Sequence, residues 1–195
     1  MLTDIEPVPA ATVALVRANT DESDLEVLLL RRSQHLVFHG GHWVFPGGRV
    51  DAGDFARAEG RREYPAARLA AVRETREEAG IDLDPSRLIH IAHWTTPPQL
   101  PRRFCTWFFL YVLNQEVSVR VDNKEIMEYR WLRPRQALAE AARERLDLPA
   151  PTTSTVRGLA RHRNVNSLLA CVNDAAIHVF PERSVYYRPQ EMGCD

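Results

Sequence analysis

Residues 73–81 read RETREEAGI, and three of these nine residues are glutamates. The segment 66–79 around them is rich in Ala, Leu, Arg and Glu, which favour helices, and Gly80 is a typical residue after a helix C-terminus. In a helix, the glutamates of this segment fall within one arc of roughly 100°. We therefore predict a helix that presents three carboxylates on one face, namely those of Glu74, Glu77 and Glu78.

The opposite side of this helix is predicted to pack on the core. Leu69, Val72 and Ala79 fall there, together with Arg76, which does not fit an apolar stripe. Carboxylates spaced at i, i+3 and i+4 repel one another. A divalent cation would relieve this repulsion, and Mg²⁺ or Mn²⁺ suits carboxylate ligands best. The alternative is a solvated helix face, which is the usual role of a charge cluster.

A glycine turn precedes the helix at residues 45–51, FPGGRVD. Together the two segments resemble the Nudix box, in which Gly, five residues and Glu are followed after seven residues by Arg-Glu-aliphatic-x-Glu-Glu-x-Gly-aliphatic. The matching positions in this chain are Gly48, Asp54 at the first acidic position, Arg73, Glu74, Glu77, Glu78, Gly80 and Ile81.

The chain departs from that motif in three places. Asp54 replaces the first glutamate, and Thr75 stands where an aliphatic residue is usual. Residues 55–72 number eighteen where the motif has seven, an insertion of eleven. The insertion, at 55–65, is rich in charged residues and is predicted to be an exposed loop, after which Pro65 opens the helix. Such an enlarged box resembles the Nudix branch that includes acyl-coenzyme A diphosphatases.

The resemblance implies a fold and a set of site residues. The expected fold is the Nudix α/β/α sandwich, a mixed sheet flanked by helices, in one domain over residues 1–195, with the box at 48–81 and a helical segment at 150–175. The expected cofactor is Mg²⁺ or Mn²⁺. The implied metal ligands are Glu74, Glu77, Glu78 and a backbone carbonyl at Gly48, and the implied catalytic residues are Glu77, Glu74 and Arg73, whose salt bridge orients a box glutamate.

Residues outside the helix are candidates for proton transfer and substrate binding. Glu125 lies in a later acidic stretch that resembles the family's second source of a general base, although most such glutamates lie on the surface. Arg102 and Arg103 follow a proline-rich loop and could clamp phosphate or be ordinary surface residues. Trp43 and Trp94 could stack on a purine or belong to the core, and Arg49 in the glycine turn is a further substrate-binding candidate.

The rest of the chain alternates between strand and helix patterns. The predicted strands are 11–17, 25–31, 43–45, 88–95, 103–113, 117–121 and 127–132, and the predicted helices after the box are 134–145, 154–163 and 165–172. Residues 146–153 are predicted to be a proline-rich connector. Two further segments resemble the acyl-coenzyme A diphosphatase branch, namely TPPQLPRRFCTWFF at 96–109 and LPAPTTST at 148–155.

Composition limits the possible functions. The chain of 195 residues suits one domain, and its formal net charge of −1 gives no general attraction to nucleic acid or to a membrane surface. Three scattered cysteines indicate a reducing compartment, and the N-terminus lacks the pattern of a signal peptide. We therefore expect a cytoplasmic protein that acts on a small molecule and could form a homodimer.

The predicted function is metal-dependent cleavage of a diphosphate linkage in a nucleoside diphosphate derivative. The favoured substrate is coenzyme A or acyl-coenzyme A, giving 3′,5′-ADP and (acyl-)4′-phosphopantetheine. The alternative substrates are ADP-ribose, nucleotide sugars and oxidised nucleotides. A non-catalytic module that senses a nucleotide is a further alternative, which the three box glutamates oppose.

Overall fold

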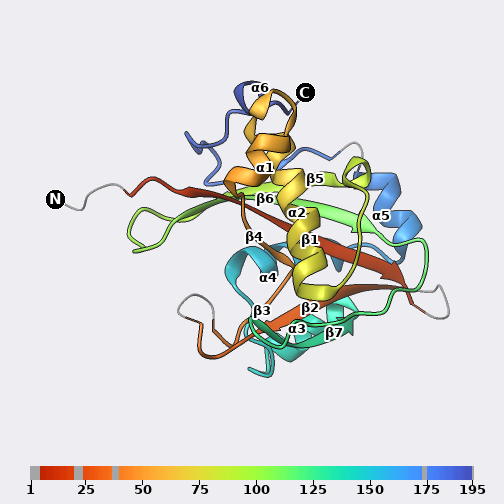
Figure 1. Ribbon diagram of the computed structural model, residues 1–195. Coiled ribbons are helices and arrows are strands. Elements are labelled where there is room, and N and C mark those ends of the chain that lie inside the picture. The colour runs from red at the N-terminus through yellow and green to blue at the C-terminus, as the bar shows by residue number, and fades with distance from the viewer. Residues whose placement is uncertain (1–4, 20–23, 37–39, 173–174, 195) are drawn as a thin grey trace.

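The computed structural model describes residues 5–19, 24–36, 40–172 and 175–194. Within this part of the chain, eight strands form one mixed sheet with helices on both faces (Figure 1). The sheet order is β3-β2-β1-β6-β5-β8, while β4 pairs with β1 and β7 pairs with β2. The strands are β1 Val8–Ala18, β2 Leu25–Arg32, β3 Trp43–Val44, β4 Gly47–Arg49, β5 Ile89–Thr95, β6 Phe104–Val112, β7 Ile126–Leu132 and β8 His178–Phe180.

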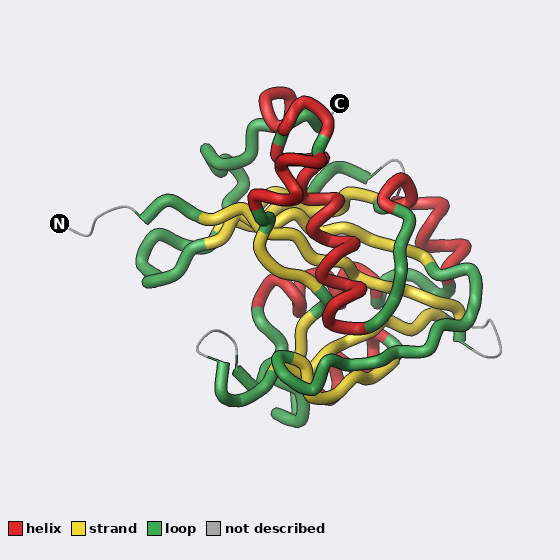
Figure 2. The backbone as a smooth tube through the Cα atoms, in the orientation of Figure 1, coloured by secondary structure: helices red, strands yellow, loops and turns green. Residues whose placement is uncertain are grey.

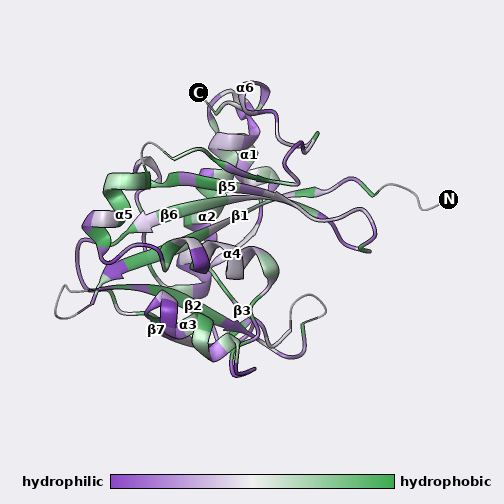
Figure 3. Ribbon diagram, turned by 180° about the vertical axis from the view of Figure 1, so that it is seen from behind, coloured by the Kyte–Doolittle hydropathy of each residue, from purple (hydrophilic) through white to green (hydrophobic). Residues whose placement is uncertain are grey.

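The helices divide between the two faces of the sheet. The longest, α2, crosses one face, and α4 and α5 lie over the other (Figures 1 and 3). The side chains of β1 alternate accordingly, because Val13 and Leu15 join the core cluster under α2, while Ala14 and Val16 join the cluster under α3, α4 and α5. The predicted α/β/α sandwich is confirmed. The helices are α1 Ala52–Arg57, α2 Glu63–Ala79, α3 Pro134–Ala141, α4 Ala150–Leu159, α5 Val165–Val172 and α6 Pro189–Met192, with short 3-10 helices η1 Glu59–Arg61 and η2 Pro85–Arg87.

The packed face of α2 matches the prediction in part. Ala79 is fully buried, and Leu69 and Val72 pack against the core cluster, although they are only half-buried. Arg76 is exposed and pairs with Asp82 at 3.3 Å. The face that packs on the sheet is made mainly of alanines, whose small side chains let the helix approach closely. Because that face continues into the last turns of α2, it carries Glu78 into the protein interior. Its buried residues are Ala66, Ala67, Ala70, Ala71, Thr75, Glu78 and Ala79.

Thr75 occupies a fully buried position where the motif usually has an aliphatic residue. Its hydroxyl donates a hydrogen bond to the carbonyl of Ala71, one turn back, at 2.7 Å. A buried polar group costs free energy only when it lacks a partner. The hydroxyl is therefore satisfied within the helix, and the departure from the motif is compatible with a packed core.

The insertion is helical, so the prediction of a loop at 55–65 was wrong. Residues 52–57 form α1, residues 59–61 form η1, and α2 begins at Glu63, two residues before Pro65. Proline is tolerated there because the first-turn N–H groups of a helix have no intrahelical acceptor. The start of α1 is stabilised by Asp54, whose Oδ2 accepts a hydrogen bond from the N–H of Asp51 at 3.0 Å.

Other predictions differ at the ends of elements. Residues 117–121, all of them described, form no strand. The N–H of Arg120 instead donates a hydrogen bond to the carbonyl of Ala79 at 2.8 Å, so this segment covers the end of α2 (Figure 2). The helix predicted at 134–145 ends at Ala141. The helix predicted from 154 begins at Ala150, inside the expected connector, because prolines are compatible with a first helical turn. No helix in the described part of the chain is both long enough and apolar enough to cross a membrane.

The glycine turn is built into the sheet beside β1. β4 pairs antiparallel with β1, with Ala11 opposite Gly48 and Thr12 opposite Gly47. β1 pairs with β2 only further along, at Val16–Ala18. The turn therefore occupies the place beside the first half of β1, where the last turns of α2 can reach it.

We expect Gly47→Ala to destabilise the protein. A Cβ at Gly47 would lie 2.3 Å from the carbonyl oxygen of Ala11 and 2.6 Å from Cα of Thr12, and both are backbone atoms that cannot move freely. Overpacking of this kind costs about 1–3 kcal/mol. At Gly53, a Cβ would have open space within 4 Å, so alanine should be neutral or gain roughly 0.5–1 kcal/mol of helix propensity. Urea unfolding measures both, and equal stability of the two variants would contradict the prediction.

Candidate active site

Arg73 connects the glycine turn, the insertion and the box glutamates. Its Nη1 donates hydrogen bonds to Glu74 Oε1 at 2.8 Å and to Glu77 Oε2 at 3.1 Å, while its Nη2 donates to Asp54 Oδ2 at 2.9 Å and to the carbonyl of Arg49 at 3.0 Å. Burial opposes the charge of Arg73, but its bonds to Asp54 and Glu74 outweigh this and raise its pKa. Arg73 therefore stays charged and holds two glutamates beside the turn.

Asp54 is an anchor for this arginine. Its side chain is 1% exposed and accepts hydrogen bonds from Arg73 and, at 3.0 Å, from Arg57. Burial raises the pKa of the Asp54 carboxyl, but the bonds from Arg73 and Asp51 exceed that effect, so the net pKa is lowered. Asp54 is thus an ionised, fully paired carboxylate that fixes α1 to α2.

Glu78 is the most deeply buried glutamate of the box. Its Oε2 accepts a hydrogen bond from the N–H of Gly47 at 2.9 Å, and its Oε1 lies 3.8 Å from Nη1 of Arg32. Burial raises the pKa of Glu78 to about 8, against the lowering effect of the Gly47 bond, and the charge of Glu74 raises it further. Near neutral pH this carboxyl therefore binds a proton, unless a bound cation takes the place of the proton.

Glu74 lies directly against the glycine turn. A Cβ on Gly48 would lie 2.4 Å from Glu74 Oε1, so only glycine permits this approach. Burial raises the pKa of Glu74, and Arg73 opposes the increase. Glu77 differs from its neighbours because its side chain is more than half exposed. The helix thus offers carboxylates at three depths beside one backbone turn.

The box supplies the kind of ligand that a hard divalent cation requires. Glu74, Glu77 and Glu78 offer only oxygen, and the backbone of Gly48 adjoins Glu74, which suits Mg²⁺ or Mn²⁺. Among the described residues these three glutamates do not form a group with ligand oxygens all within 4.8 Å of one another. Arg73 binds Glu74 and Glu77, and the N–H of Gly47 binds Glu78. Glu74, Glu77, Glu78 and the backbone of Gly48 stay a prediction as the residues that would hold a cation.

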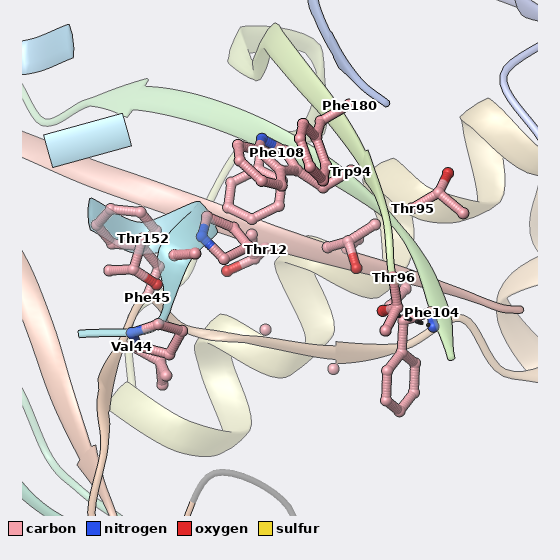
Figure 4. Close-up of a pocket in the computed structure, with 18 of the residues that line it drawn as sticks. Thr12, Val44, Phe45, Trp94, Thr95, Thr96, Phe104, Phe108, Thr152 and Phe180 are labelled. Atoms are coloured by element: carbon pink, nitrogen blue, oxygen red, sulfur yellow. Dashed lines mark hydrogen bonds between the residues drawn. The ribbon is translucent and has the colours of Figure 1, made fainter. Parts of the chain in front are cut away.

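A cavity of about 650 Å³ opens beside the glycine turn. Its polar lining includes Arg32, Arg49 and the glycine turn at Gly47 and Gly48. Much of the remaining lining is apolar, and Figure 4 shows Trp94, Phe108 and Phe180 grouped together, the first and last with ring centroids 4.4 Å apart in a stacked arrangement. The apolar and aromatic residues that line the cavity include Val44, Phe45, Trp94, Pro97, Leu100, Phe104, Phe108 and Phe180.

The structure separates the predicted substrate-binding residues into two groups. Arg49 and Arg102 line the cavity. Trp43 is buried in the core cluster under α3 and α4, with the guanidinium of Arg130 5.9 Å from its ring centre, and it is not among the described residues that line the cavity. The predicted stacking role of Trp43 is therefore corrected to a core role, and of the two tryptophans considered it is Trp94 that faces the cavity.

Arg103 also has a structural role. Its side chain is buried, its Nη1 donates to the carbonyl of Ile5 at 2.6 Å, and its Nε donates to the carbonyl of Thr96 at 3.2 Å. These bonds tie the start of the chain to the loop that precedes β6. The described residues lining the large cavity include Arg102 but not Arg103, so the predicted pair of phosphate-clamping arginines is reduced to one.

Arg32 is a site residue that was not predicted from the sequence. It lines the cavity at the end of β2, 3.8 Å from Glu78 on one side and 3.8 Å from Glu125 Oε2 on the other. Glu125 is 59% exposed, and its carbonyl accepts a hydrogen bond from the N–H of Ser33 at 2.7 Å, which holds it beside β2. The sequence feature that could have identified Arg32 is the pair of arginines, Arg31 and Arg32, at the end of a buried apolar strand. Phe180 lies 86 residues after Trp94, and no sequence feature places the two side by side.

The comparisons with known proteins agree with this geometry. A family model described as the NUDIX domain matches residues 7–150, well over half of the chain. The chain therefore belongs to the Nudix family.

Two curated relatives and one solved structure illustrate the similarity. The chain is 25% identical over 237 residues to "Acyl-coenzyme A diphosphatase NUDT19" of Xenopus laevis, covering 75% of this chain and 62% of the relative. It is 30% identical over 160 residues to "Putative nudix hydrolase 7" of Caenorhabditis elegans, covering 64% of this chain and 52% of the relative. The crystal structure of a NUDIX hydrolase from Alicyclobacillus acidocaldarius matches with a TM-score of 0.74 and 25% identity, covering 86% of this chain and 97% of that chain. The chain thus spans little more than half the length of the curated relatives.

The buried position of Glu78 predicts a pH effect on stability. In protein stripped of divalent cations, the folded-state pKa of about 8 lies above the ordinary value of 4.5, so the folded protein binds a proton that the unfolded chain lacks. Stability from this group is therefore present at low pH and lost as pH rises from about 5 to about 8. The Glu78→Gln variant keeps a neutral side chain and should gain stability relative to wild type across that range.

Chemical denaturation in the presence of a chelator, repeated at several pH values, measures this difference. Glu191→Gln is a suitable control, because Glu191 is exposed in α6 and pairs only with Arg188 among the ion pairs of the described residues. A difference between wild type and Glu78→Gln that does not change with pH would show that the Glu78 carboxyl titrates normally.

Proposed function

We propose that this protein is a metal-dependent hydrolase that cleaves the diphosphate linkage of a nucleoside diphosphate derivative, with coenzyme A or acyl-coenzyme A as its substrate. The products are then 3′,5′-ADP and (acyl-)4′-phosphopantetheine. ADP-ribose, nucleotide sugars and oxidised nucleotides are the alternative substrates. Family membership and the names of the relatives support hydrolysis of this class, and the resemblance to acyl-coenzyme A diphosphatases supports the choice of substrate.

The observation that carries this proposal is the mixed lining of the cavity. The lining combines three arginines with the glycine turn next to Glu74 and Glu78, which suits a diphosphate beside a cation-binding carboxylate cluster. Its aromatic and aliphatic walls suit an apolar chain or a purine ring. Coenzyme A derivatives carry both features in one molecule, with a diphosphate between an adenine nucleotide and a pantetheine arm.

Phosphoanhydride hydrolysis requires an attacking water, a base and positive charge near the phosphoryl oxygens. A bound Mg²⁺ or Mn²⁺ would supply activation of water and charge neutralisation. Arg32, Arg49 and Arg102 would bind and orient the phosphates, and Arg73 would keep Glu74 and Glu77 in position. The water oxygen bonds to phosphorus, the bond from phosphorus to the bridging oxygen breaks, and two phosphate monoesters result.

The proton of the attacking water needs an acceptor. Glu125 is the proposed base, because its carboxylate is exposed near the cavity and lies 3.8 Å from Arg32, which itself lines the cavity. Glu77 is the alternative, since it is the most exposed of the box glutamates. Glu78 is less suitable, because its side chain is buried and the N–H of Gly47 already occupies one of its oxygens.

A substrate screen with a matched pair of variants tests the proposal. Purified protein with Mg²⁺ or Mn²⁺ is assayed against coenzyme A, acyl-coenzyme A, ADP-ribose, NADH and nucleoside triphosphates. We expect coenzyme A species to be preferred, and Glu77→Gln to reduce turnover by a factor of about 10² or more, in keeping with loss of a metal ligand or base. Glu59→Gln removes an exposed glutamate of η1 and should leave turnover unchanged.

The outcomes of this screen are distinct. Preference for ADP-ribose over every coenzyme A species would contradict the proposed substrate but would agree with the proposed reaction. Full activity in Glu77→Gln would overturn the role of the box helix. Binding of nucleotides without turnover under any cation would favour a sensing module over an enzyme.

The stacked rings of Phe180 and Trp94 in the cavity wall lead to a further prediction. Removing the ring of Phe180 deletes part of the stacked pair with Trp94, so Phe180→Ala should weaken binding of a long acyl-coenzyme A. Loss of roughly 1.4 kcal/mol of apolar contact corresponds to about a tenfold rise in KM, with little change in kcat. Tyr129→Ala is the control, because Tyr129 is similarly exposed on β7 and is not among the described residues lining the cavity. Equal KM values in the two variants would contradict the assignment.

A further inference from the structure

A second cluster of ligating side chains lies on the face of the sheet opposite the cavity. His93 of β5 and Cys105 of β6 lie on paired strands, with His93 opposite Trp107. Their sequence neighbours Trp94 and Thr106 line the cavity, so His93 and Cys105 point to the other face, toward α2. Glu63, the first residue of α2, completes the group, and one ligand atom from each of the three residues lies within 4.8 Å of the others.

His93 is buried without the hydrogen bonds that such a residue normally makes. It is 0% exposed, and within the described part of the chain neither of its ring nitrogens has a hydrogen-bond partner. Its ring packs against Trp107 at 4.8 Å and Tyr187 at 4.9 Å between centroids, and neither ring supplies a hydrogen bond to the His93 nitrogens. Leaving a polar side chain buried and unpaired costs about 1–3 kcal/mol. A ligand that binds this nitrogen would remove the cost.

The three side chains are suited to ligating a cation. Burial lowers the pKa of His93 to about 3, so its imidazole is neutral and has a lone pair available. Burial also raises the pKa of Glu63, against the lowering effects of the Trp107 hydrogen bond and the charge of Arg188, and it raises the pKa of Cys105 to about 12. Deprotonated together, the carboxylate and the thiolate would carry two negative charges, which a divalent cation would balance.

We propose that Glu63, His93 and Cys105 bind one borderline-soft divalent transition-metal ion, for which Zn²⁺ is the best match. Sulfur and imidazole nitrogen are ligands that Zn²⁺ prefers, whereas the all-oxygen box near the other end of α2 suits Mg²⁺ or Mn²⁺. Zinc bonds of about 2.0–2.3 Å in a tetrahedron bring ligand atoms roughly 3.3–3.8 Å apart. The present separations, at most 4.8 Å, need only side-chain adjustments of about 1 Å to close on an ion.

The surroundings already orient part of this site. The indole N–H of Trp107 donates a hydrogen bond to Glu63 Oε1 at 2.8 Å, which fixes the carboxylate as outer partners do in known metal sites. Three protein ligands leave a fourth position for water. The ion would connect the start of α2 to β5 and β6, so its expected effect is to stabilise the fold rather than to take part in diphosphate cleavage.

Cobalt provides a probe that distinguishes this site from the box. Full-length protein is stripped with a chelator and titrated with Co²⁺, and a cysteine ligand gives a thiolate-to-cobalt charge-transfer band that oxygen ligands cannot produce. We expect one equivalent of Co²⁺ to produce the band in wild type, and Cys105→Ala to lose it. Cys171→Ala and Cys194→Ala, which remove the other two cysteines, should retain it.

A second measurement covers the case in which Cys105→Ala does not fold. Zn²⁺ at one equivalent should raise the Tm of wild type, and the rise should be abolished in His93→Gln while Glu77→Gln keeps it. Absence of the charge-transfer band in folded wild type overturns the proposal by itself. So does a band that survives in folded Cys105→Ala, or a Zn²⁺-induced rise in Tm that is equal in wild type and His93→Gln.

Discussion

The ion pair between Arg73 and Asp54 is the constraint on which the site depends. Asp54 is almost fully buried, and its partner also binds Glu74, Glu77 and the backbone of the glycine turn. Removing one member of a fully buried pair costs about 3–5 kcal/mol, and the cost here is smaller because Arg57 also binds Asp54 and two glutamates also bind Arg73. By comparison, the exposed ion pair of Arg76 and Asp82 contributes roughly 0–1 kcal/mol to the stability of the fold. The first pair therefore positions α1, β4 and α2 together, whereas the second has little influence on the site.

Much of the fold could be predicted because it rests on local pattern. The strong strands, the helix before Gly80 and the layered sandwich followed from apolar runs, helix formers and the resemblance of the box. The insertion could not be predicted in this way, because its helix depends on Asp54, which accepts a hydrogen bond from the N-cap residue Asp51 and is itself bound by a residue nineteen positions later. The packed face of α2 was predicted only in part. Leu69 and Val72 pack against the core as hydrophobicity indicated, but close approach to the sheet gives the fully buried positions to the smaller alanines.

The candidate site was predictable only where it is contiguous in sequence. The box residues lie together in the chain, but the cavity combines Arg32, Trp94 and Phe180 from three strands that are far apart in the sequence. Whether a tryptophan faces a core or a cavity depends on strand pairing rather than on its own neighbours. Trp94 lies opposite Thr106 and faces the cavity with it, whereas Trp43 packs in the core beneath α3 and α4. Sequence pattern alone led to the same prediction for both.

The cavity on one face of the sheet and the cluster with His93 on the other both depend on the register of β6. β6 pairs in parallel with β1 over nine residues, from Val8 opposite Phe104 to Val16 opposite Val112. Because side chains alternate, a slip of one residue would exchange Cys105 and Trp107 with their neighbours Thr106 and Phe108. The cavity would lose its apolar wall, and the cluster with His93 would lose its sulfur and the indole that orients Glu63. The apolar surface of both cores opposes such a slip, so the same packing that stabilises the sheet keeps the two groups of polar residues on separate faces.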